Sequence, residues 1–372
     1  MTGSVEQYIR ILDQLAPARL AESWDNVGLQ IGSPSWPVKK ICTALDPSLE
    51  VVTWACDYGA DLLVTHHPLF FTPIRHIDGE SHLGRIIEMA LTRRLAIFCA
   101  HTNLDSTMGG VNDALAHRIG LEDLRALGSG TDANLCKLVV FVPADHVASM
   151  LAMVNDLDIG RIGHYRCCTF RGEGIGTFLP DEKANPAVGE KGILNEVQES
   201  RFETIVPKDR LGPVIESLKK VHPYETMAYD VYPVLAIDPQ TGLGRIGKLK
   251  SPLSLEAFAK KIKSAFDLKW VKMVGNPDMV VETVAICSGS GASLMETATS
   301  SGAQVYVTGD LGYHAAKDAQ QAGIGLVDIG HFASEHLIAG VLAENLKGAM
   351  EVSALAAVVT AIDLEKDPFR YI

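Results

Sequence analysis

Short apolar runs alternate with amphipathic segments in the first third of the chain. The runs at 38–45, 61–65 and 95–100 are rich in Val, Ile and Leu and have the length of buried strands. The segments between them, 47–59 and 84–94, carry apolar residues at helical spacing. Strands that alternate with helices in this way predict βαβ units and a mostly parallel sheet covered on both faces.

The same alternation returns near the other end of the chain. Strands are predicted at 282–289, 303–308 and 323–330, and helices at 293–302 and 312–323. A second set of βαβ units is therefore expected after a long intervening segment.

The two sets resemble each other in sequence. Residues 57–67 align with 300–310, with a Gly-Ala pair, an apolar strand and Val-Thr in register. Residues 101–105 and 331–335 each begin with histidine and end with a carboxylate. The pattern predicts a duplicated three-layer α/β core with mixed sheets.

The segment between the two halves follows another pattern. Its elements read β-α-β-β-β-α-β and predict a ferredoxin-like α+β insert domain, with a hairpin turn at the Gly-rich residues 171–176. The Pro- and Gly-bearing residues 237–244 are expected to be the linker back to the core. We therefore place the first half of the core at 1–128, the insert at 129–238 and the second half at 239–372.

The composition and net charge of the chain limit the classes of partner that it is expected to bind. The chain has 372 residues, of which 47% are hydrophobic and 21% charged, and this suffices for two or three domains. The net charge of −12 and the pI near 5.5 argue against nucleic acid as a partner. An anionic substrate is still compatible with an acidic chain if a metal ion supplies positive charge.

The N-terminus and the cysteines indicate the compartment. Ser4 and Gln7 form a predicted capping box of an amphipathic helix instead of a signal peptide. No run of 18 apolar residues occurs, which argues against a membrane span. The 7 cysteines are scattered without a CxxC, and Cys167 and Cys168 would point to opposite faces of a predicted strand. We expect reduced thiols and a cytoplasmic protein.

Ligand-type side chains follow three of the predicted strands. His66 and His67 end one strand of the first half, and Asp105 follows the next. His331 and Glu335 follow the last strand of the second half. Because the loops beyond the carboxyl ends of parallel strands face a crevice, we expect these five side chains to converge on one rim.

The spacing of these residues suits two metal ions. Two adjacent histidines in a tight turn cannot readily chelate one small ion, so His66 and His67 would each bind one of a pair. Glu335 would bridge the two ions, about 3.5–4 Å apart, with a hydroxide as the second link. Nitrogen and carboxylate ligands favour zinc, iron, manganese, cobalt or nickel. The predicted ligands of two divalent ions per subunit are His66, His67, Asp105, His331 and Glu335.

A simpler explanation exists for each pair taken alone. His66 and His67 could donate hydrogen bonds in an ordinary loop, and His331 with Glu335 could form a surface pair. Their joint position at equivalent strand ends of a repeated unit favours the metal site.

Three more polar residues are candidates for roles around the ions. His101 aligns with His331 and could be a ligand, an orienter of the neighbouring carboxylate or a proton carrier. Asp310 aligns with His67, and His314 follows four residues later, so both could support the ligands from behind. A capping or structural role is the alternative for each. No general acid or base is identified.

Other motifs give weaker evidence for a functional site than the predicted metal ligands do. Residues 222–225, His-Pro-Tyr-Glu, look like a ligand set, but the proline and the strand context favour a turn. Residues 242–247 lack the following helix and acidic partner of a dinucleotide fingerprint. Neither a P-loop nor a GxSxG elbow occurs.

At these residues the sequence becomes similar to a known family. The motifs resemble the NIF three-like family, whose members are often labelled GTP cyclohydrolase 1 type 2 homologs. The resemblance spans nearly the whole chain in order and rests on 23–32, 64–71, 101–105, 307–310 with His314, 330–336 and the closing 367–369. It implies a dinuclear metal site with the same five ligands and a ring-shaped homohexamer. The middle segment, through 222–233, is similar to inserts related to PII and CutA-type trimeric proteins.

Two functions are compatible with these expectations. The first is a metal-dependent hydrolase, in which two cations lower the pKa of a bridging water. The resemblance implies GTP as its substrate, with hydroxide attack on the imidazole ring, although a related nucleotide or phosphoester would suit the same ions. The second is a non-catalytic hexamer that holds metal and acts as a regulator or scaffold.

Overall fold

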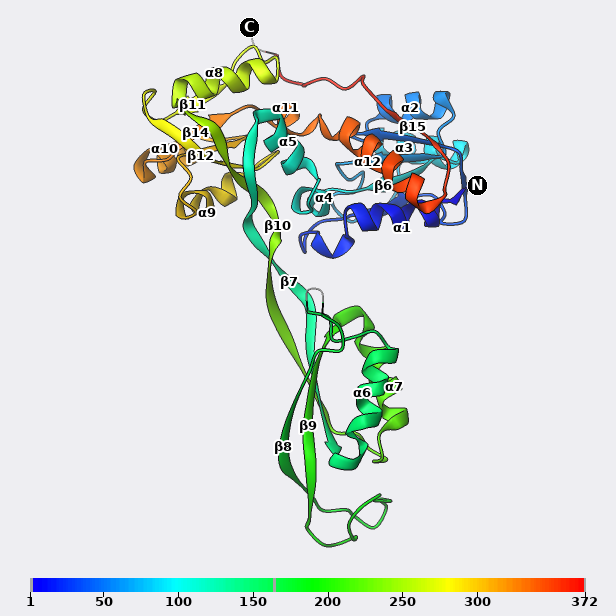
Figure 1. Ribbon diagram of the computed structural model, residues 1–372. Coiled ribbons are helices and arrows are strands. Elements are labelled where there is room, and N and C mark those ends of the chain that lie inside the picture. The colour runs from blue at the N-terminus through cyan, green and yellow to red at the C-terminus, as the bar shows by residue number, and fades with distance from the viewer. Residues whose placement is uncertain (1–2, 163–164, 371–372) are drawn as a thin grey trace. The chain divides into compact units, whose positions relative to one another are not determined.

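The computed structural model of the protein describes residues 3–162 and 165–370. The chain divides into two compact units (Figure 1). The core unit consists of Met1–Gly130 together with Asp238–Ile372, and the insert unit consists of Thr131–Ile237.

The first half of the core unit is built on a five-stranded sheet. Its strand order is β15-β4-β5-β6-β2. Four strands run parallel, and β2 pairs antiparallel with β6. The bounds are β2 (Gly28–Ile31), β4 (Lys40–Ala44), β5 (Leu62–Thr65), β6 (Ala96–Cys99) and β15 (Val358–Ala361).

Helices cover both faces of this sheet because its strands are apolar on both sides. Leu62 and Val64 of β5 pack with residues of α1 and α12, whereas Leu63 packs with residues of α2 and α3. Successive side chains of a strand point to opposite faces, so a continuous apolar run needs two covering layers. The helices are α1 (Val5–Leu15), α2 (Leu49–Tyr58), α3 (His82–Arg93) and α12 (Ile338–Ser353).

The second half repeats this plan around three parallel strands. Strands β12, β13 and β14 lie in chain order, and β11 pairs antiparallel with β14. Apolar residues of α5 and α8 cover one face, and residues of α9 and α10 cover the other. The elements are α5 (Val111–Ile119), α8 (Leu255–Ala265), β11 (Lys272–Val274), β12 (Val280–Ile286), α9 (Met295–Ser300), β13 (Val305–Thr308), α10 (Tyr313–Ala322) and β14 (Gly325–Asp328).

A short helix follows the third parallel strand of each half. Helix α4 (Thr102–Ser106) comes after β6, and α11 (His331–Glu335) comes after β14. The two halves therefore have the same sequence of elements at the carboxyl end of their sheets. The mixed α/β architecture predicted from the sequence is confirmed.

The insert unit follows the order β-α-β-β-α-β. Strand β9 pairs antiparallel with β7 and with β8, and residues of α6 and α7 pack on Val140 and Phe202. The long strands β7 and β10 belong to both units, and β10 also pairs with β12 in the core. The elements are β7 (Leu121–Pro143), α6 (Val147–Asp156), β8 (Thr169–Phe178), β9 (Asn195–Pro207), α7 (Leu211–Val221) and β10 (Tyr229–Ser254).

Two glycine-rich segments have a different conformation from the one predicted. Residues 171–176 form no hairpin turn but lie inside β8, which pairs with β9 along its whole length. Residues 237–244 lie inside β10 instead of a loop, although the chain does return to the core unit there, at 237/238. In both strands glycine serves close packing: a Cβ on Gly176 would collide with the Glu199 carboxylate, and a Cβ on Gly242 would meet the backbone oxygen of Leu127 at 2.7 Å.

The adjacent cysteines also differ from the prediction. Cys167 and Cys168 precede β8, and Cys167 has a left-handed backbone with φ 55°. Their alternation along a strand therefore does not apply, and their thiols contact Asn155 and the Arg166 carbonyl, respectively. All seven cysteines are free thiols.

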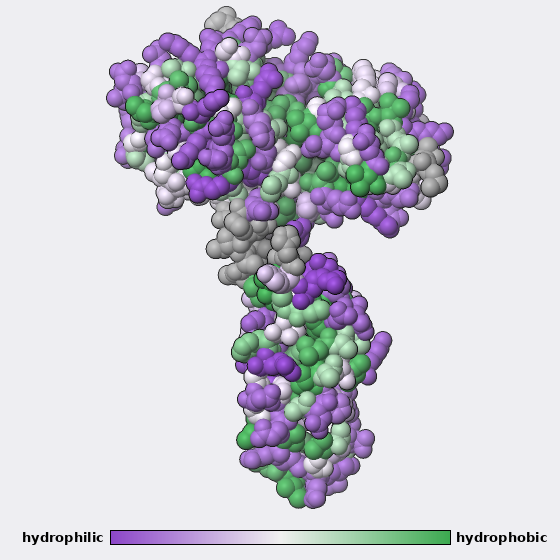
Figure 2. Space-filling view, viewed as in Figure 1, coloured by the Kyte–Doolittle hydropathy of each residue, from purple (hydrophilic) through white to green (hydrophobic). Residues whose placement is uncertain are grey.

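The polar character of the viewed surface agrees with the proportion of charged residues in the chain. The viewed face of the core unit is largely hydrophilic, with hydrophobic residues scattered between (Figure 2). Among the described residues, no helix has the length and apolar character needed to span a membrane.

Candidate metal centre

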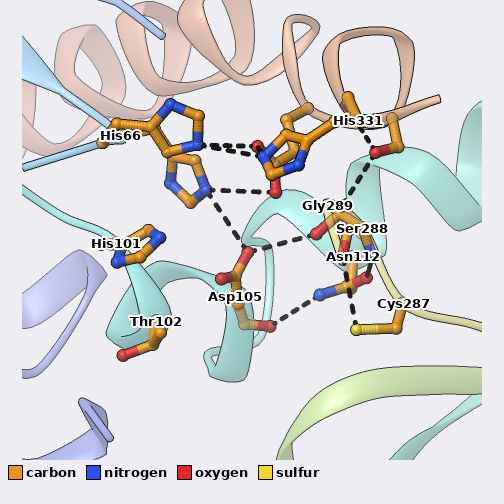
Figure 3. Close-up of polar contacts among 12 residues, drawn as sticks. His66, His101, Thr102, Asp105, Asn112, Cys287, Ser288, Gly289 and His331 are labelled. Atoms are coloured by element: carbon orange, nitrogen blue, oxygen red, sulfur yellow. Dashed lines mark hydrogen bonds and ion pairs between the residues drawn. The ribbon is translucent and has the colours of Figure 1, made fainter. Parts of the chain in front are cut away.

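The five residues predicted as ligands meet in the core unit. His66 and His67 directly follow β5, Asp105 lies in α4, and His331 and Glu335 lie in α11. In the described part of the chain, three sets of residues could each hold a metal ion, because the donor atoms within each set lie within 4.8 Å of one another (Figure 3). The sets are His66–Asp105–Glu335, His67–His331–Glu335 and His66–His67–His101.

The imidazole of His66 has one satisfied and one open nitrogen. Its Nδ1 lies 3.0 Å from the carbonyl oxygen of Ala100 and donates to it, which leaves the lone pair of Nε2 facing the centre. Nε2 is buried without a hydrogen-bond partner. The nearest carboxylate oxygens belong to Asp105, at 3.6 Å, and Glu335, at 3.8 Å. A buried polar atom without a partner needs an explanation, and a cation bound to this nitrogen would supply one.

Glu335 faces both sides of the centre. Its Oε1 is the oxygen nearest His66, while its Oε2 lies 2.9 Å from Nε2 of His67 and 3.0 Å from Nε2 of His331. The side chain is almost fully buried. The two oxygens therefore serve different imidazoles, as a bridging carboxylate would.

Acceptors behind the imidazoles set their orientation. Asp46 lies 2.7 Å from Nδ1 of His67, and Asp310 lies 2.7 Å from Nδ1 of His331. In each case Nδ1–H donates to the carboxylate, so Nε2 is turned toward Glu335. Carboxylates in this position fix the ring of a metal-binding histidine and make it a stronger ligand.

The charges of the centre shift its pKa values. Burial alone would lower the pKa of His67, but hydrogen bonds to Asp46 and Glu335 raise it to about 10. The hydrogen bond to Glu335 raises the pKa of His331 to about 9. Burial would raise the pKa of Glu335, yet its hydrogen bonds to His331 and His67 and the nearby imidazole of His66 hold that pKa well below the usual range. The carboxylate is thus ionised beside imidazoles that bind either protons or a cation.

The pKa of Asp105 is shifted in the opposite direction to that of Glu335. Burial, together with the neighbouring charge of Glu335, raises its pKa, although His66 opposes this. Its Oδ1 accepts a hydrogen bond of 3.2 Å from the Ser288 hydroxyl. Two buried carboxylates at one site favour the binding of positive charge.

The three additional candidates have different positions. His101 belongs to one of the close donor sets, and its Nδ1 lies 2.9 Å from Asp25. Asp310 accepts from His331, as described above. His314 is exposed on α10 beside the ring of Tyr313, and the described residues place it in none of the donor sets.

The backbone near Glu335 leaves no room for a side chain. Gly289 has φ 62°, and a Cβ there would collide with Oε1 of Glu335. Its N–H donates 2.8 Å to the hydroxyl of Ser334, which in turn donates to the carbonyl of His331. The turn after β12 therefore holds α11 against the centre.

Several supporting residues were missed from the sequence. Asp46 and Ser288 each follow a parallel strand of one half, so the strand-end rule that identified the histidines could have found them. Asp25 lies in a loop before β2, and Asn112 lies in α5. Asn112 binds both the Asp105 carbonyl and the Ser288 N–H. No periodic signal marks such residues.

A cavity of about 420 Å³ opens beside the centre. Its wall includes His67 and His331 together with the rings of Trp270, Phe332 and Phe369. Lys272 also lines it, paired with Asp328 at 3.0 Å. A planar ligand of nucleobase size would find aromatic contacts next to the imidazoles.

Comparison with known proteins gives consistent matches. Residues 4–368 match the model of Duf34/NIF3 (NGG1p interacting factor 3). Proteins named GTP cyclohydrolase 1 type 2 homolog are 40% identical in Halalkalibacterium halodurans, over 364 residues and 98% of both chains, and 40% in Bacillus subtilis, over 336 residues and 90% of both. The crystal structure of a Bacillus cereus protein related to NIF3 is 37% identical with a TM-score of 0.76, covering 100% of this chain and 99% of that one.

Proposed function

The chain belongs to the Duf34/NIF3 family, and from this premise we propose that it binds two divalent metal ions and acts as a metal-dependent hydrolase. The observation that carries the proposal is the shared carboxylate of Glu335, with one oxygen toward His66 and the other toward His67 and His331. One ion would be held by His66, Asp105 and Glu335, and the other by His67, His331 and Glu335.

The donor set fits transition metals. It consists of imidazole nitrogens and carboxylate oxygens without thiolate, which suits zinc, iron, manganese, cobalt or nickel. A bound pair of such ions supplies positive charge and an activated water. The protein's own part is to orient the imidazoles through Asp46 and Asp310 and to hold the substrate in the adjoining cavity.

The substrate class is proposed from the relatives and the cavity together. The relatives are named for a GTP cyclohydrolase, so we propose hydrolytic opening of the GTP imidazole ring, or hydrolysis of a related nucleotide or phosphoester. Trp270, Phe332 and Phe369 line the cavity, where a purine would contact aromatic side chains. A phosphate chain would need the metal charge, because Lys272 is already paired.

A pair of glutamate variants tests this function. Glu335→Gln keeps the side-chain shape but removes the shared charge, so we expect loss of bound metal and of metal-dependent GTP turnover, with an unchanged circular dichroism spectrum. Glu344→Gln changes an exposed glutamate of α12 and should retain both properties. Metal content is measured by mass spectrometry, and turnover by formate release. Full metal binding without turnover of GTP or any phosphoester would refute the hydrolase and favour a metal-holding regulator.

We also propose that the chain assembles as a homohexamer whose insert units are PII/CutA-like. The hexamer rests on the family resemblance. The insert assignment is supported by its β-α-β-β-α-β order and by the strand order β10-β7-β9-β8. Native mass spectrometry should give six times the chain mass of 40.1 kDa. A monomeric or dimeric mass at micromolar concentration would contradict the assembly.

A further inference from the structure

The insert unit contains a cavity of its own. The cavity has a volume of about 280 Å³ and lies between the end of β8, the segment 179–188 and the segment 224–228. All of its lining residues belong to the insert unit, so it is separate from the candidate metal centre. Its size suits a ligand of one ring or a short branched chain.

The wall is apolar with acidic groups set into it. Phe178, Leu179, Pro180, Pro186 and Val188 form most of the apolar surface. The ionisable residues of the lining are two glutamates and one tyrosine, and none of the lining residues is a Lys, Arg or His. The electrostatic character of the cavity is therefore negative.

Glu199 is the central polar group. It is only 9% exposed, and its Oε1 accepts a hydrogen bond of 2.9 Å from the hydroxyl of Tyr224. Within the described ranges, no cationic side chain pairs with this carboxylate. Gly176 lies beneath it, where any Cβ would collide with Oε2. The missing side chain at 176 makes room for the carboxylate at the cavity wall.

A network of hydrogen bonds holds Tyr224 and Glu225 in place. Nε2–H of His222 donates 2.9 Å to the carbonyl of Phe141, and its Nδ1 accepts 3.1 Å from the N–H of Tyr224. Burial lowers the pKa of His222, which keeps the ring neutral in this role. Glu225 accepts from the N–H of Asn185 and ties the covering segment to the turn. The His-Pro-Tyr-Glu motif is thus a turn that positions Tyr224 and Glu225.

We propose that this cavity binds a small organic cation, with its charged N–H group on Glu199 and its apolar body against Phe178 and the prolines. A nearly buried carboxylate pays a desolvation penalty that one neutral hydroxyl does not offset. A charged donor offsets it through a charge-assisted hydrogen bond. An anion would instead meet two carboxylates, and a neutral ring would leave the charge of Glu199 unpaired.

Three isosteric probes test the charge requirement on the full chain. Benzamidine, benzamide and benzoate share one ring size but are cationic, neutral and anionic, respectively. Isothermal titration calorimetry should show saturable binding of benzamidine, and binding about tenfold or more weaker for the other two, since a charged hydrogen bond is worth about 1.5–3 kcal/mol. Equal affinity for benzoate, or no saturable binding of benzamidine, would overturn the proposal.

Matched variants locate the site. Glu199→Gln keeps the acceptor for Tyr224 but removes the charge, so benzamidine affinity should fall about tenfold or more. Glu196→Gln, an exposed position on the same strand, should leave the affinity unchanged. Ala184→Phe fills the cavity from its covering segment and should abolish binding even if the glutamine variant proves unstable. Undiminished affinity in both the Glu199→Gln and Ala184→Phe proteins would contradict the assignment, whereas metal content should be unchanged in all three.

Discussion

At the scale of single residues, protons and cations compete for the same imidazole nitrogens of the candidate centre. His67 and His331 each have one nitrogen on a supporting aspartate and the other on Glu335. Both nitrogens are therefore surrounded by negative charge, which favours the imidazolium form when no cation is bound. Metal binding must displace these protons.

The raised pKa values predict an extended pH dependence of metal binding. Because His67 and His331 have pKa values of about 10 and 9, protons compete with the metal well above neutrality. The apparent zinc affinity should therefore keep rising between pH 7 and 8.5, by up to about tenfold per pH unit for each proton displaced. Competition against a chelator, corrected for the chelator's own protonation, measures it. A plateau above pH 7 would indicate imidazoles with ordinary pKa values near about 6.5.

The candidate ligands could be predicted from sequence because each follows a strand whose apolar pattern is strong. His66, His67 and Glu335 needed only the rule that sites lie at the carboxyl ends of parallel strands. Asp25 and Asn112 could not be found in this way. Their contacts depend on where a loop and a helix from other parts of the chain pack, and no local spacing encodes that.

At the scale of elements, the turns between strand and helix determine how closely the ligands approach. The turn after β12 passes directly beneath Glu335, and only a glycine fits there. Gly289 also has the left-handed backbone that other residues adopt at a cost of about 1–2 kcal/mol.

Two alanine variants separate these two roles of glycine. Gly289→Ala should lower metal affinity by about ten- to a hundredfold, because the new Cβ displaces the Glu335 carboxylate. Gly302→Ala introduces the same left-handed strain, at φ 83°, in open space. It should lower the free energy of unfolding and leave metal affinity unchanged. Similar metal affinities for both variants would show that the collision is relieved elsewhere.

Arg245 joins three elements beneath the centre. Its guanidinium is fully buried on β10 and pairs with Asp113 of α5 at 2.7 Å. It also donates to the carbonyls of Ser106 and Thr107, at the end of the helix that carries Asp105. A single side chain thus fixes α4 to the strand behind it.

Removal of this guanidinium should be costly. Arg245→Met removes the cation from the largely buried Asp113 carboxylate, which keeps the Gly109 N–H as a donor, and takes the donor from several carbonyls, so we expect the free energy of unfolding to fall by about 3–5 kcal/mol. Arg10→Met removes an ion pair between side chains that are 72% and 57% exposed, and should cost less than about 1 kcal/mol. Urea unfolding followed by circular dichroism measures both. Equal losses would mean that the buried pair contributes little.

Most elements of the core could be predicted from the sequence, but the glycine-rich parts of the long strands were predicted as irregular segments. Continuous apolar runs identify β5 and β13, because both faces of each strand are buried. Gly176 belongs to a segment predicted as a turn and Gly242 to one predicted as a linker, yet both lie in strands where a carboxylate or another backbone approaches closely. Glycine permits turns and close approach alike, and only the tertiary partner distinguishes them.

At the scale of the whole molecule, the candidate centre connects the two halves of the core unit but includes no residue of the insert unit. Its residues come from 66–105 and 331–335, which lie on either side of the insert in sequence. Cations bound there would link the two sheets of the core unit.

Metal removal should therefore loosen the core selectively. Ions that bind only the folded state add about 2.7 kcal/mol of stability at one hundred times their Kd. After chelation, amide hydrogen exchange should accelerate in β5, β6 and β14 and remain unchanged in α6 and α7. The Glu335→Gln protein should show no effect of chelation. Equal acceleration in both units would contradict a centre confined to the core.

The division of the chain follows the change in the pattern of elements. The sequence places the insert at 129–238, and the contacts of the folded chain divide the units at 130/131 and 237/238. The strands β7 and β10 pass between the units without interruption, and the sequence did not show that the connections are strands.

The wide separation of the bridging carboxylate from its histidines has a consequence during synthesis. His67 leaves the ribosome long before Glu335 is translated, by on the order of tens of seconds at typical elongation rates. Throughout that interval the nascent chain carries exposed imidazoles but lacks the group that joins them. Ion loading of the proposed centre would therefore be a late event that begins only after almost the entire polypeptide has been made.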